Sequence, residues 1–426
     1  MRVLVIGSGA REHALASRLA AERDVTEVVC APGNPGIATV ARTVAADVAE
    51  PEALLALAER EHIDFTVVGP ELPLTVGIAD RFADEHRLLL GPTASAARLE
   101  SSKAFAKAFM ARHRVPTARF RTCDTLEEAL GCVRAAEFGW PLVLKADGLA
   151  AGKGVIIAAD RAEAESAVRA FMEERRYGGA GSRLVLEECL NGPEVSFFVV
   201  SDGTRALPIG AAQDHKRIFD GDRGPNTGGM GAFAPSLLVD DALHARIMER
   251  IVDPVIAGMA AEGHPFRGFL YVGLMLTPAG PRVIEFNARL GDPEAQVILP
   301  LIAEPLLPVL VAAAAGELRQ SSCRRSADKL VGVVLASRGY PESAESGSPI
   351  SGLEDAEREP GVTVYHAGTA RRAGRIVTAG GRVLTVVGRA DDFPEAAARA
   401  YAGVRHVSFD GMHYRRDIGQ KAIARG

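Results

Sequence analysis

The sequence is poor in cysteine, and its few thiols are scattered. It has five cysteines, namely Cys30, Cys123, Cys132, Cys189 and Cys323. The number is odd, the spacings are wide, and no two cysteines are separated by only two residues. These features argue against a disulfide framework or a zinc site, and they predict a protein of a reducing compartment.

Charge of one sign and long apolar runs are also lacking. Lysine and arginine number 49 against 54 acidic residues, a net charge of −5, so there is no overall basic field for nucleic acid. The most apolar run, 297–315, is broken by Glu304 and three prolines, and the N-terminal MRVLVIG enters a strand without a signal-peptide pattern. We therefore expect no nucleic-acid partner, no membrane span and a cytoplasmic location.

What is present is an ordinary globular composition in an α/β rhythm. Apolar residues make up 47% of the chain and charged residues 24%, and 426 residues suffice for roughly three domains of about 150 residues each. Short apolar strands alternate with helices in the first 100 residues, which predicts a parallel sheet with ligands at the carboxyl ends of its strands. A strand-rich segment from residue 329 onward predicts a small C-terminal domain.

The most informative stretch is RVIEFNARLGDPE, residues 282–294. Glu285, Asn287 and Arg289 occupy every second position, and on an extended chain such positions share one face. Carboxylate and amide oxygens are ligands that suit Mg²⁺, and an arginine offers a fork for phosphate oxygens. A turn follows at 291–293, where sites tend to lie. The pattern predicts a metal and phosphate site, with a solvated strand face as the alternative.

The N-terminal strand ends in Gly7-Ser8-Gly9, and a helix follows from Arg11. A strand, a glycine turn and a helix N-terminus form an anion site, because free N–H groups point at it. Glu12 stands where a dinucleotide fingerprint has its third glycine, which argues against a bulky pyrophosphate. Arg11 and His13 favour a phosphate at this turn. A tight turn without a ligand stays open as the alternative.

A second glycine-rich stretch, PLVLKADGLAAGKGV at 141–155, has a strand on either side. The first strand delivers Lys145, and the loop holds Lys153 between Gly152 and Gly154. Such a hairpin can close backbone N–H groups over phosphates while the lysines supply charge. It is not a Walker A loop, because GxxxxGK[ST] is missing and a strand follows it. An ordinary hairpin with exposed lysines is the alternative.

Charged side chains flank this hairpin on both sides in the sequence. Lys103 and Lys107 are four residues apart on a predicted helix, so both ammonium groups share one face, where solvation is the plain interpretation. Further along, an apolar strand contains Glu187 and Glu188, and Glu194 follows a turn. This arrangement suits an adenine and ribose pocket, with Glu194 accepting from ribose hydroxyl groups. An ordinary polar hairpin is equally compatible with it.

The stretch 214–235, DHKRIFDGDRGPNTGGMGAFAP, has no helical or strand periodicity and holds five glycines. Long loops without structure of their own are usually functional or disordered. Four large apolar side chains within it argue against disorder. We therefore expect an ordered substrate loop, followed by a helix at 240–262.

Together these motifs resemble the ATP-grasp superfamily, and within it the phosphoribosylamine–glycine ligase family. The resemblance covers essentially the whole chain, although the family usually has glycine where this chain has Ala10. It implies a Rossmann-like parallel-sheet domain at 1–100, an ATP-grasp domain at 101–325 with a lid at about 116–190, and a small α+β domain at 326–426. The motifs that carry it are GSGAREHA, KADGLAAGKGV, HKRIFDGDRGPNTGGMGAFAP and EFNARLGDPEAQ, with HAGT, GGRVL and YRRDIG near the end.

The resemblance also implies a reaction. The family joins glycine to 5-phospho-D-ribosylamine in the second step of purine synthesis, with ATP going to ADP and phosphate through a glycyl phosphate. Such a transfer depends on positioning and charge neutralisation, so no Ser/His or Cys/His nucleophile is needed. The implied cofactors are ATP as co-substrate and Mg²⁺ or Mn²⁺, and the implied partners are small molecules, with the chain acting as a monomer.

Carried over by motif position, the resemblance implies a role for each group of site residues. Glu285 and Asn287 would hold the metal, and Arg289, Asp214 and Lys216 would be catalytic. ATP would contact Lys103, Lys145, Gly152, Lys153, Gly154, Val155, Glu187, Glu188, Leu190 and Glu194. The substrates would contact Gly9, Arg11, Glu71, Arg217 and Asp292. Many ATP-grasp enzymes have a further acid on the preceding strand, but LYVGLMLT at 270–277 has none, so water or another residue must complete the metal shell.

Three other interpretations compete with this one. A sibling ATP-grasp enzyme acting on formate or bicarbonate, or a biotin carboxylase, shares the central motifs but not the 214–235 loop. A nicotinamide-dependent oxidoreductase is suggested by Gly7-Ser8-Gly9 and disfavoured by Glu12. A nucleotide-binding regulator without catalysis is disfavoured because it need not keep the metal and transfer groups.

Overall fold

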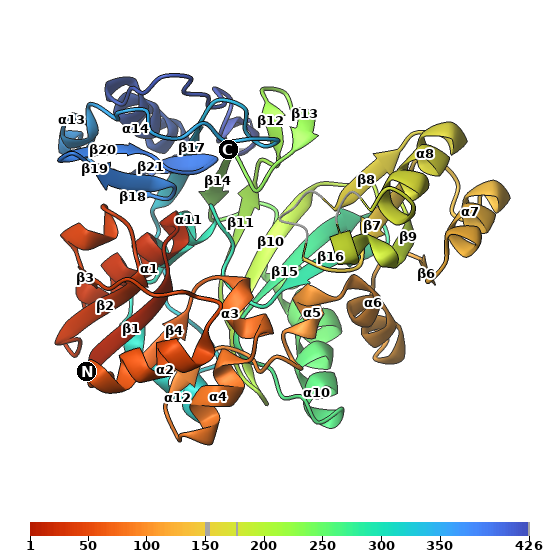
Figure 1. Ribbon diagram of the computed structural model, residues 1–426, viewed down its shortest axis with the longest axis horizontal. Coiled ribbons are helices and arrows are strands. Elements are labelled where there is room, and N and C mark those ends of the chain that lie inside the picture. Colours follow the sequence, from red (N-terminus) through yellow and green to blue (C-terminus); the bar gives the residue numbers. More distant parts are fainter. Residues whose placement is uncertain (150–153, 176–177, 425–426) are drawn as a thin grey trace.

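The computed structural model describes residues 1–149, 154–175 and 178–424, and its first part is a doubly wound parallel sheet (Figure 1). Its elements are β1 (Arg2–Gly7), α1 (Ala10–Ala20), β2 (Glu27–Pro32), η1 (Ile37–Thr39), β3 (Arg42–Thr43), α2 (Pro51–Arg60), β4 (Phe65–Val68), α3 (Glu71–Thr75), α4 (Ile78–Asp84) and β5 (Leu89–Leu90). The strands lie in the order β3-β2-β1-β4-β5 and all are parallel. Helix α1 packs on one face, while α2 and α4 pack on the other. The strands are apolar on both faces because helices cover both.

An eight-stranded antiparallel sheet forms the centre of the molecule and runs on into its C-terminal part. Its strands are β10 (Glu194–Asp202), β11 (Ala206–Asp214), β14 (Gly231–Ala234), β15 (Arg267–Thr277), β16 (Gly280–Asn287), β17 (Lys329–Ala336), β18 (Val362–His366) and β21 (Arg382–Ala390). Their order is β16-β15-β10-β11-β14-β17-β21-β18. Pairing of β14 with β17 joins the two halves, so backbone hydrogen bonds cross the predicted boundary at 325/326. The domain boundaries themselves stay a prediction.

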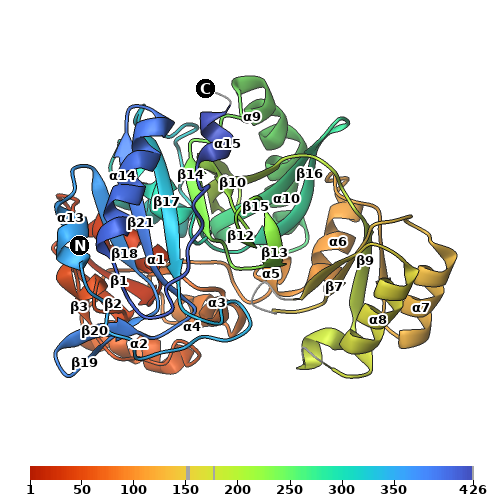
Figure 2. The same cartoon turned by 90° about the horizontal axis from the view of Figure 1, so that it is seen from above.

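A separate lobe projects from the body (Figure 2). Its elements are β6 (Phe120–Cys123), α7 (Leu126–Ala135), β7 (Leu142–Ala146), β8 (Val155–Ala158), α8 (Arg161–Met172), η2 (Gly178–Ser182) and β9 (Leu184–Glu188). The strands lie in the order β6-β9-β7-β8, and the predicted hairpin is confirmed because β7 pairs with β8 in antiparallel fashion. Thr125 and Asp160 cap the two helices, which pack over the sheet around a core of their own.

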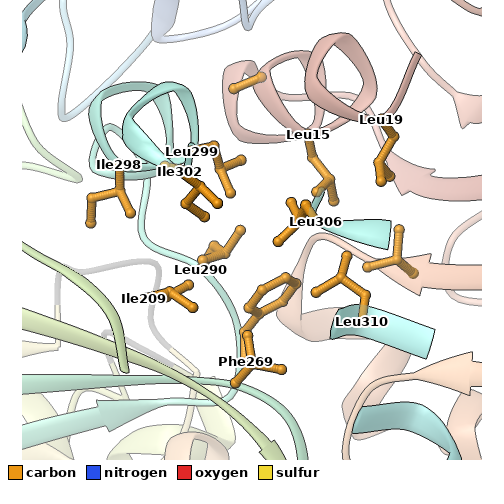
Figure 3. Packing of buried hydrophobic residues seen from close by; sticks show 14 of the residues in the cluster. Leu15, Leu19, Ile209, Phe269, Leu290, Ile298, Leu299, Ile302, Leu306 and Leu310 are labelled. Carbon is orange, nitrogen blue, oxygen red and sulfur yellow. The ribbon is translucent and has the colours of Figure 1, made fainter. Parts of the chain in front are cut away.

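The remaining elements lie between and around the sheets. They are α5 (Arg98–Ser101), α6 (Lys103–Arg112), β12 (Arg217–Phe219), β13 (Arg223–Asn226), α9 (Asp241–Ile247), η3 (Met248–Val252), α10 (Asp253–Ala261), α11 (Ala295–Ile298), η4 (Leu299–Leu301), α12 (Leu307–Ala315), α13 (Leu353–Arg358), β19 (Thr369–Arg372), β20 (Arg375–Thr378), α14 (Phe393–His406) and α15 (Gln420–Ile423). Figure 3 shows side chains of α1, α11 and α12 meeting Phe269 of β15 in one core. Leu290, which follows β16, is buried in the same core and anchors the end of that strand.

Two expectations from the sequence are corrected here. The stretch 214–235 is ordered as expected, but it is not a loop throughout, because it contains the short strands β12, β13 and β14. These strands are three or four residues long and lie among glycines, so no alternation of apolar and polar residues is visible in the sequence. The segment expected as one helix at 240–262 is interrupted between α9 and α10 by a π-helical turn, next to Pro254, which cannot donate a helical N–H bond. Within the three described ranges, the structure contains no helix long and apolar enough to span a membrane.

Candidate active site

A cavity of about 1350 Å³ opens where the parallel sheet, the eight-stranded sheet and the projecting lobe meet. It gathers most of the predicted site residues, namely Arg11, Glu71, Lys103, Lys145, Gly154, Val155, Glu187, Glu188, Leu190, Glu194, Asp214, Lys216, Arg217, Glu285, Asn287, Arg289 and Asp292. Among the predicted site residues that the structure describes, Gly9 does not line the cavity. The predicted residues Gly152 and Lys153 lie outside the described residues.

Strand β16 presents its polar residues to the cavity from alternate positions. Glu285 pairs with Gly273 of β15, and Asn287 pairs with Tyr271, so both project from the same face of the sheet. Burial alone would raise the pKa of Glu285, but Lys216 and the other cations around it hold that pKa below its usual value. The carboxylate is therefore ionised and able to bind a cation.

Arg289 is held firmly by the protein along part of its guanidinium. Its Nε donates to Glu71 Oε2 at 2.8 Å, its Nη1 donates to the Leu290 carbonyl at 3.0 Å, and its Nη2 lies 3.1 Å from Glu100 Oε1. A guanidinium carries five N–H groups, so these contacts fix its plane and leave donors for a ligand. Glu100, which also accepts from the Ala288 N–H at 2.7 Å, is a site residue that sequence reasoning missed.

Lysines of the helix and of the lobe meet at a shared carboxylate. Lys107 Nζ lies 2.8 Å from Glu187 Oε2, and Lys145 Nζ lies 3.0 Å from Glu187 Oε1. Lys107, Lys145 and Glu187 are only 2%, 4% and 3% exposed, so the expected solvated face is wrong for Lys107. Lys103 is half-buried, and its Nζ lies 3.5 Å from the Gly148 carbonyl at the start of the glycine-rich loop.

The predicted adenosine end contains acids with different partners. Glu188 accepts from both the N–H and the Nε of Arg119 and lies 3.1 Å from Arg282 Nη1, so its side chain is already engaged. Glu194 accepts from Lys216 Nζ at 2.8 Å but is exposed enough to reach a ligand. Glu188 and Leu190 can therefore contact a nucleotide through their backbone N–H and C=O groups, whereas Glu194 can contact it through its carboxylate.

Asp214 and Glu294 form a second acidic group, and both interact electrostatically with Lys216. Burial raises the pKa of Asp214, and although Lys216 lowers it again, the neighbouring carboxylates keep it well above its usual range. Glu294 is 4% exposed and accepts from Ser196 Oγ at 3.0 Å. Glu294 was also missed, because its contact with Ser196 spans 98 residues of sequence.

The glycine turn after β1 is filled by the chain's own carboxylate. Glu12 Oε2 accepts from the Gly9 N–H at 2.5 Å, and Glu12 Oε1 pairs with Arg11 Nε. The helix N-terminus therefore already has an anion, which disfavours a dinucleotide pyrophosphate there. His13 is 5% exposed, and its Nδ1 accepts from the His366 N–H at 2.9 Å, so it joins the C-terminal part of the chain instead of the cavity.

The C-terminal part contributes cavity residues for which the sequence motifs predicted no role. Arg382 donates to the carbonyls of Gly228 and Asp292 at 2.7 and 2.5 Å, and the Tyr340 hydroxyl accepts from the Gly228 N–H at 2.9 Å. Both side chains line the cavity. In the sequence, Arg382 was marked only by its place in the GGRVL motif, to which no site role was assigned.

The donor set fits a metal ion that takes few protein ligands. Across the described ranges, no group of three or more histidines, cysteines or acids is placed to hold a metal. Glu285 and Asn287 supply two oxygen donors, and Mg²⁺ commonly takes one or two protein groups and completes its shell with phosphate oxygens and water. The pair therefore fits Mg²⁺ bound together with a nucleotide.

Comparison with known proteins covers the whole chain. Sequence models of phosphoribosylglycinamide synthetase match the N domain at 1–100, the ATP-grasp (A) domain at 101–295 and the C domain at 330–421. The chain belongs to the phosphoribosylamine–glycine ligase family. A ligase of this name from Xylella fastidiosa strain Temecula1 is 50% identical, covering 100% of this chain and 99% of the relative, and one from Xanthomonas axonopodis pv. citri is 49% identical over the same shares.

Solved structures agree with this family assignment. The crystal structure of phosphoribosylamine–glycine ligase from Thermotoga maritima is 35% identical, with a TM-score of 0.86 over 98% of this chain and 100% of that one. A biotin carboxylase from Campylobacter jejuni is 17% identical with a TM-score of 0.75 over 97% of this chain and 92% of that one, which shows a shared fold alone. Glu285, Asn287 and Arg289 lie within the stretch that the A-domain model matches.

Proposed function

We propose that this chain joins glycine to 5-phospho-D-ribosylamine, using ATP and giving N1-(5-phospho-D-ribosyl)glycinamide, ADP and phosphate in the second step of purine synthesis. The observation that carries the proposal is the convergence of Glu285, Asn287 and Arg289 with Lys145 on one cavity. The names of relatives about half identical over their full length support the choice of substrates.

The chemistry requires activation of a carboxylate, which is a poor electrophile as it stands. The glycine carboxylate attacks the γ-phosphorus of ATP, and the bond from that phosphorus to the bridging oxygen breaks to release ADP. The ribosylamine nitrogen then attacks the carbonyl carbon of glycyl phosphate, and inorganic phosphate leaves with the shared electron pair. Both steps depend on positioning and on charges placed around the phosphoryl group.

The nucleotide would lie between the lobe and strand β16. Lys103, Lys145, Gly154 and Val155 would contact its phosphates, while Glu187, Glu188, Leu190 and Glu194 would surround its adenosine. Glu285 and Asn287 would hold Mg²⁺ or Mn²⁺, which when bound neutralises phosphate charge. Arg289 would direct its remaining N–H groups at the transferred phosphoryl oxygens, because its other donors are fixed by Glu71 and the Leu290 carbonyl.

The attacking amine must lose a proton, and the cavity contains a suitable acceptor. Asp214 has a raised pKa and interacts with Lys216. We therefore propose that Asp214 accepts the proton of the amine and that Lys216 binds the glycine carboxylate. Gly9, Arg11 and Glu71 would face the phosphoribosyl group. Arg217 would contact glycine or the ribosylamine, and Asp292 would be a further substrate contact. Burial alone would raise the pKa of Asp292, but the positive charges of Arg382, Arg11 and Arg289 keep it below its usual value.

We further propose that the enzyme acts as a monomer in the cytoplasm, with domain boundaries near residues 100 and 325 and a lid at about 116–190. One chain supplies cavity residues from its N-terminal, central and C-terminal parts, so the proposed chemistry needs no partner subunit. All five thiols are free, which fits a reducing compartment. Light scattering coupled to size-exclusion chromatography tests the assembly.

The proposed reaction is tested by measuring ADP formation with Mg-ATP, glycine and freshly prepared 5-phosphoribosylamine, leaving out each component in turn. We expect ADP only when all are present. ADP formed with another carboxylate in place of glycine would preserve carboxylate activation but refute the substrate. Absence of ATP turnover in every combination would refute the ligase proposal.

A further inference from the structure

A buried ionic network lines the proposed nucleotide site, and it is centred on a lysine for which the proposed reaction has no role. Lys107 of α6 is 2% exposed, donates to Thr117 Oγ1 at 2.7 Å and pairs with Glu187 Oε2 at 2.8 Å. Among the described residues, no donor meets hydrogen-bond geometry at Glu187 Oε1, although Lys145 Nζ is 3.0 Å away. The shorter ion-pair contact of Glu187 is therefore the one with Lys107.

The network joins the projecting lobe to the body of the enzyme. Thr117 Oγ1 donates to the Val283 carbonyl at 2.7 Å, and Lys145 Nζ donates to the Ile284 carbonyl at 3.0 Å. Both carbonyls belong to β16, immediately before Glu285. Lys145 and Glu187 belong to β7 and β9 of the lobe, whereas Lys107 belongs to α6 of the body. These contacts tie the lobe strands to the proposed metal strand.

Lys107 gives the network an excess of positive charge. Two ammonium groups share one carboxylate, which leaves a net positive charge facing the cavity. Without Lys107, Glu187 would be buried with Lys145 as its cationic partner, and a buried charge is costly unless it is paired. Lys145 would then be drawn into a complete ion pair with Glu187 and would offer less charge to a phosphate.

We propose that Lys107 is a positioning residue for the nucleotide, acting by holding Glu187 so that Lys145 stays available to the phosphates of ATP. The inference rests on the proposed function of the site. Its own observable is nucleotide affinity, which can be measured without glycine or 5-phosphoribosylamine and without turnover.

The test compares Lys107→Met with Lys107→Arg by titration calorimetry, using Mg²⁺ and the non-hydrolysable analogue AMP-PNP. Methionine keeps the length of the side chain and removes its charge, whereas arginine keeps the charge. We expect Lys107→Met to weaken binding by about tenfold or more, because the lost contacts involve charged groups. Lys107→Arg should recover part of that loss. In steady-state assays the KM for ATP should rise while the KM for glycine stays near wild type.

The control is Arg112→Met on the same helix, which removes the exposed pair with Glu262. It should leave nucleotide affinity unchanged. Thr117→Val provides a milder change if Lys107→Met does not fold, because it removes one contact of Lys107; it should weaken nucleotide binding relative to the wild type. Wild-type nucleotide affinity in Lys107→Met, or in Thr117→Val when that is the variant that folds, would overturn the proposal. A failure of the ligase assay with nucleotide affinity still dependent on Lys107 would instead refute the proposed function alone.

Discussion

Replacing Arg289 with lysine tests the most specific role assigned to any side chain here. The guanidinium is fixed by Glu71, the Leu290 carbonyl and Glu100, and the remaining donors are proposed to contact the transferred phosphoryl group. Lysine keeps the positive charge but loses the planar fork, so it cannot contact both acids and a ligand together. Alanine is a poorer choice, because it would leave Glu71 and the buried Glu100 without their cation.

The expected loss follows from the contacts that lysine cannot make. A hydrogen bond to a charged group contributes roughly 1.5–3 kcal/mol, and each 1.4 kcal/mol or so corresponds to a tenfold change in rate. Arg289→Lys should therefore lower kcat/KM by roughly 10- to 150-fold, with most of the loss in kcat, because the contact is proposed to strengthen in the transition state.

Continuous detection of ADP at saturating glycine measures this loss, with circular dichroism to confirm folding. Arg42→Lys is the matched control, since Arg42 also bridges two glutamates, Glu27 at 2.8 Å and Glu61 at 2.6 Å, but lies outside the cavity. Surface pairs of this kind contribute little, so its activity should stay near wild type. If Arg289→Lys and Arg42→Lys are equally active, Arg289 has no part in phosphoryl transfer.

Two further predictions follow from the site and from the buried histidines. Glu285→Gln removes a charged oxygen ligand and should raise the Mg²⁺ concentration needed for half-maximal activity by about tenfold; an unchanged Mg²⁺ titration would contradict the assigned metal site. Burial lowers the pKa of His13 to about 3 and the pKa values of His215 and His366 to about 4. Because these values lie below the unfolded value of about 6.5, the unfolded chain binds protons first, and stability is lost as the pH falls from about 6.5 toward the folded values. The loss should be roughly 1–2 kcal/mol per histidine at pH 5, measured by urea unfolding at pH 7.5 and 5. His13→Asn, which keeps an acceptor for the His366 N–H, should reduce the loss by one histidine's share, and equal stability at both pH values would refute the assignment.

Local patterns were enough to predict the elements that place the site. The alternation of Glu285, Asn287 and Arg289 is a period-two signal; in the structure the first two lie on β16, Arg289 follows its end, and all three line one cavity. The hairpin of β7 and β8 could be predicted because a glycine-rich segment separates two apolar runs. The replacement of a glycine by Glu12 was enough to disfavour a dinucleotide, and the structure has that carboxylate on the helix N-terminus.

Contacts between distant segments could not be predicted in the same way. Glu100 meets Ala288 across 188 residues, and Arg382 meets Gly228 across 154 residues, so no local period contains either pair. Lys107 looked like a solvated helix residue because its spacing from Lys103 describes one face of a helix, not what covers that face. The lobe covers it with Glu187, and burial then decides the chemistry of the lysine.

Oxygen-isotope transfer tests most directly whether ATP activates the glycine carboxylate. Glycine labelled with ¹⁸O in both carboxylate oxygens is turned over with Mg-ATP and 5-phosphoribosylamine, and the released phosphate is analysed by mass spectrometry. Phosphorylation of the carboxylate predicts one ¹⁸O atom in each phosphate, because the bond that breaks on amine attack lies between carbon and the bridging oxygen. The amide product should keep the other label. Phosphate without ¹⁸O, formed together with the amide, would show that the carboxylate is never phosphorylated and would contradict the account.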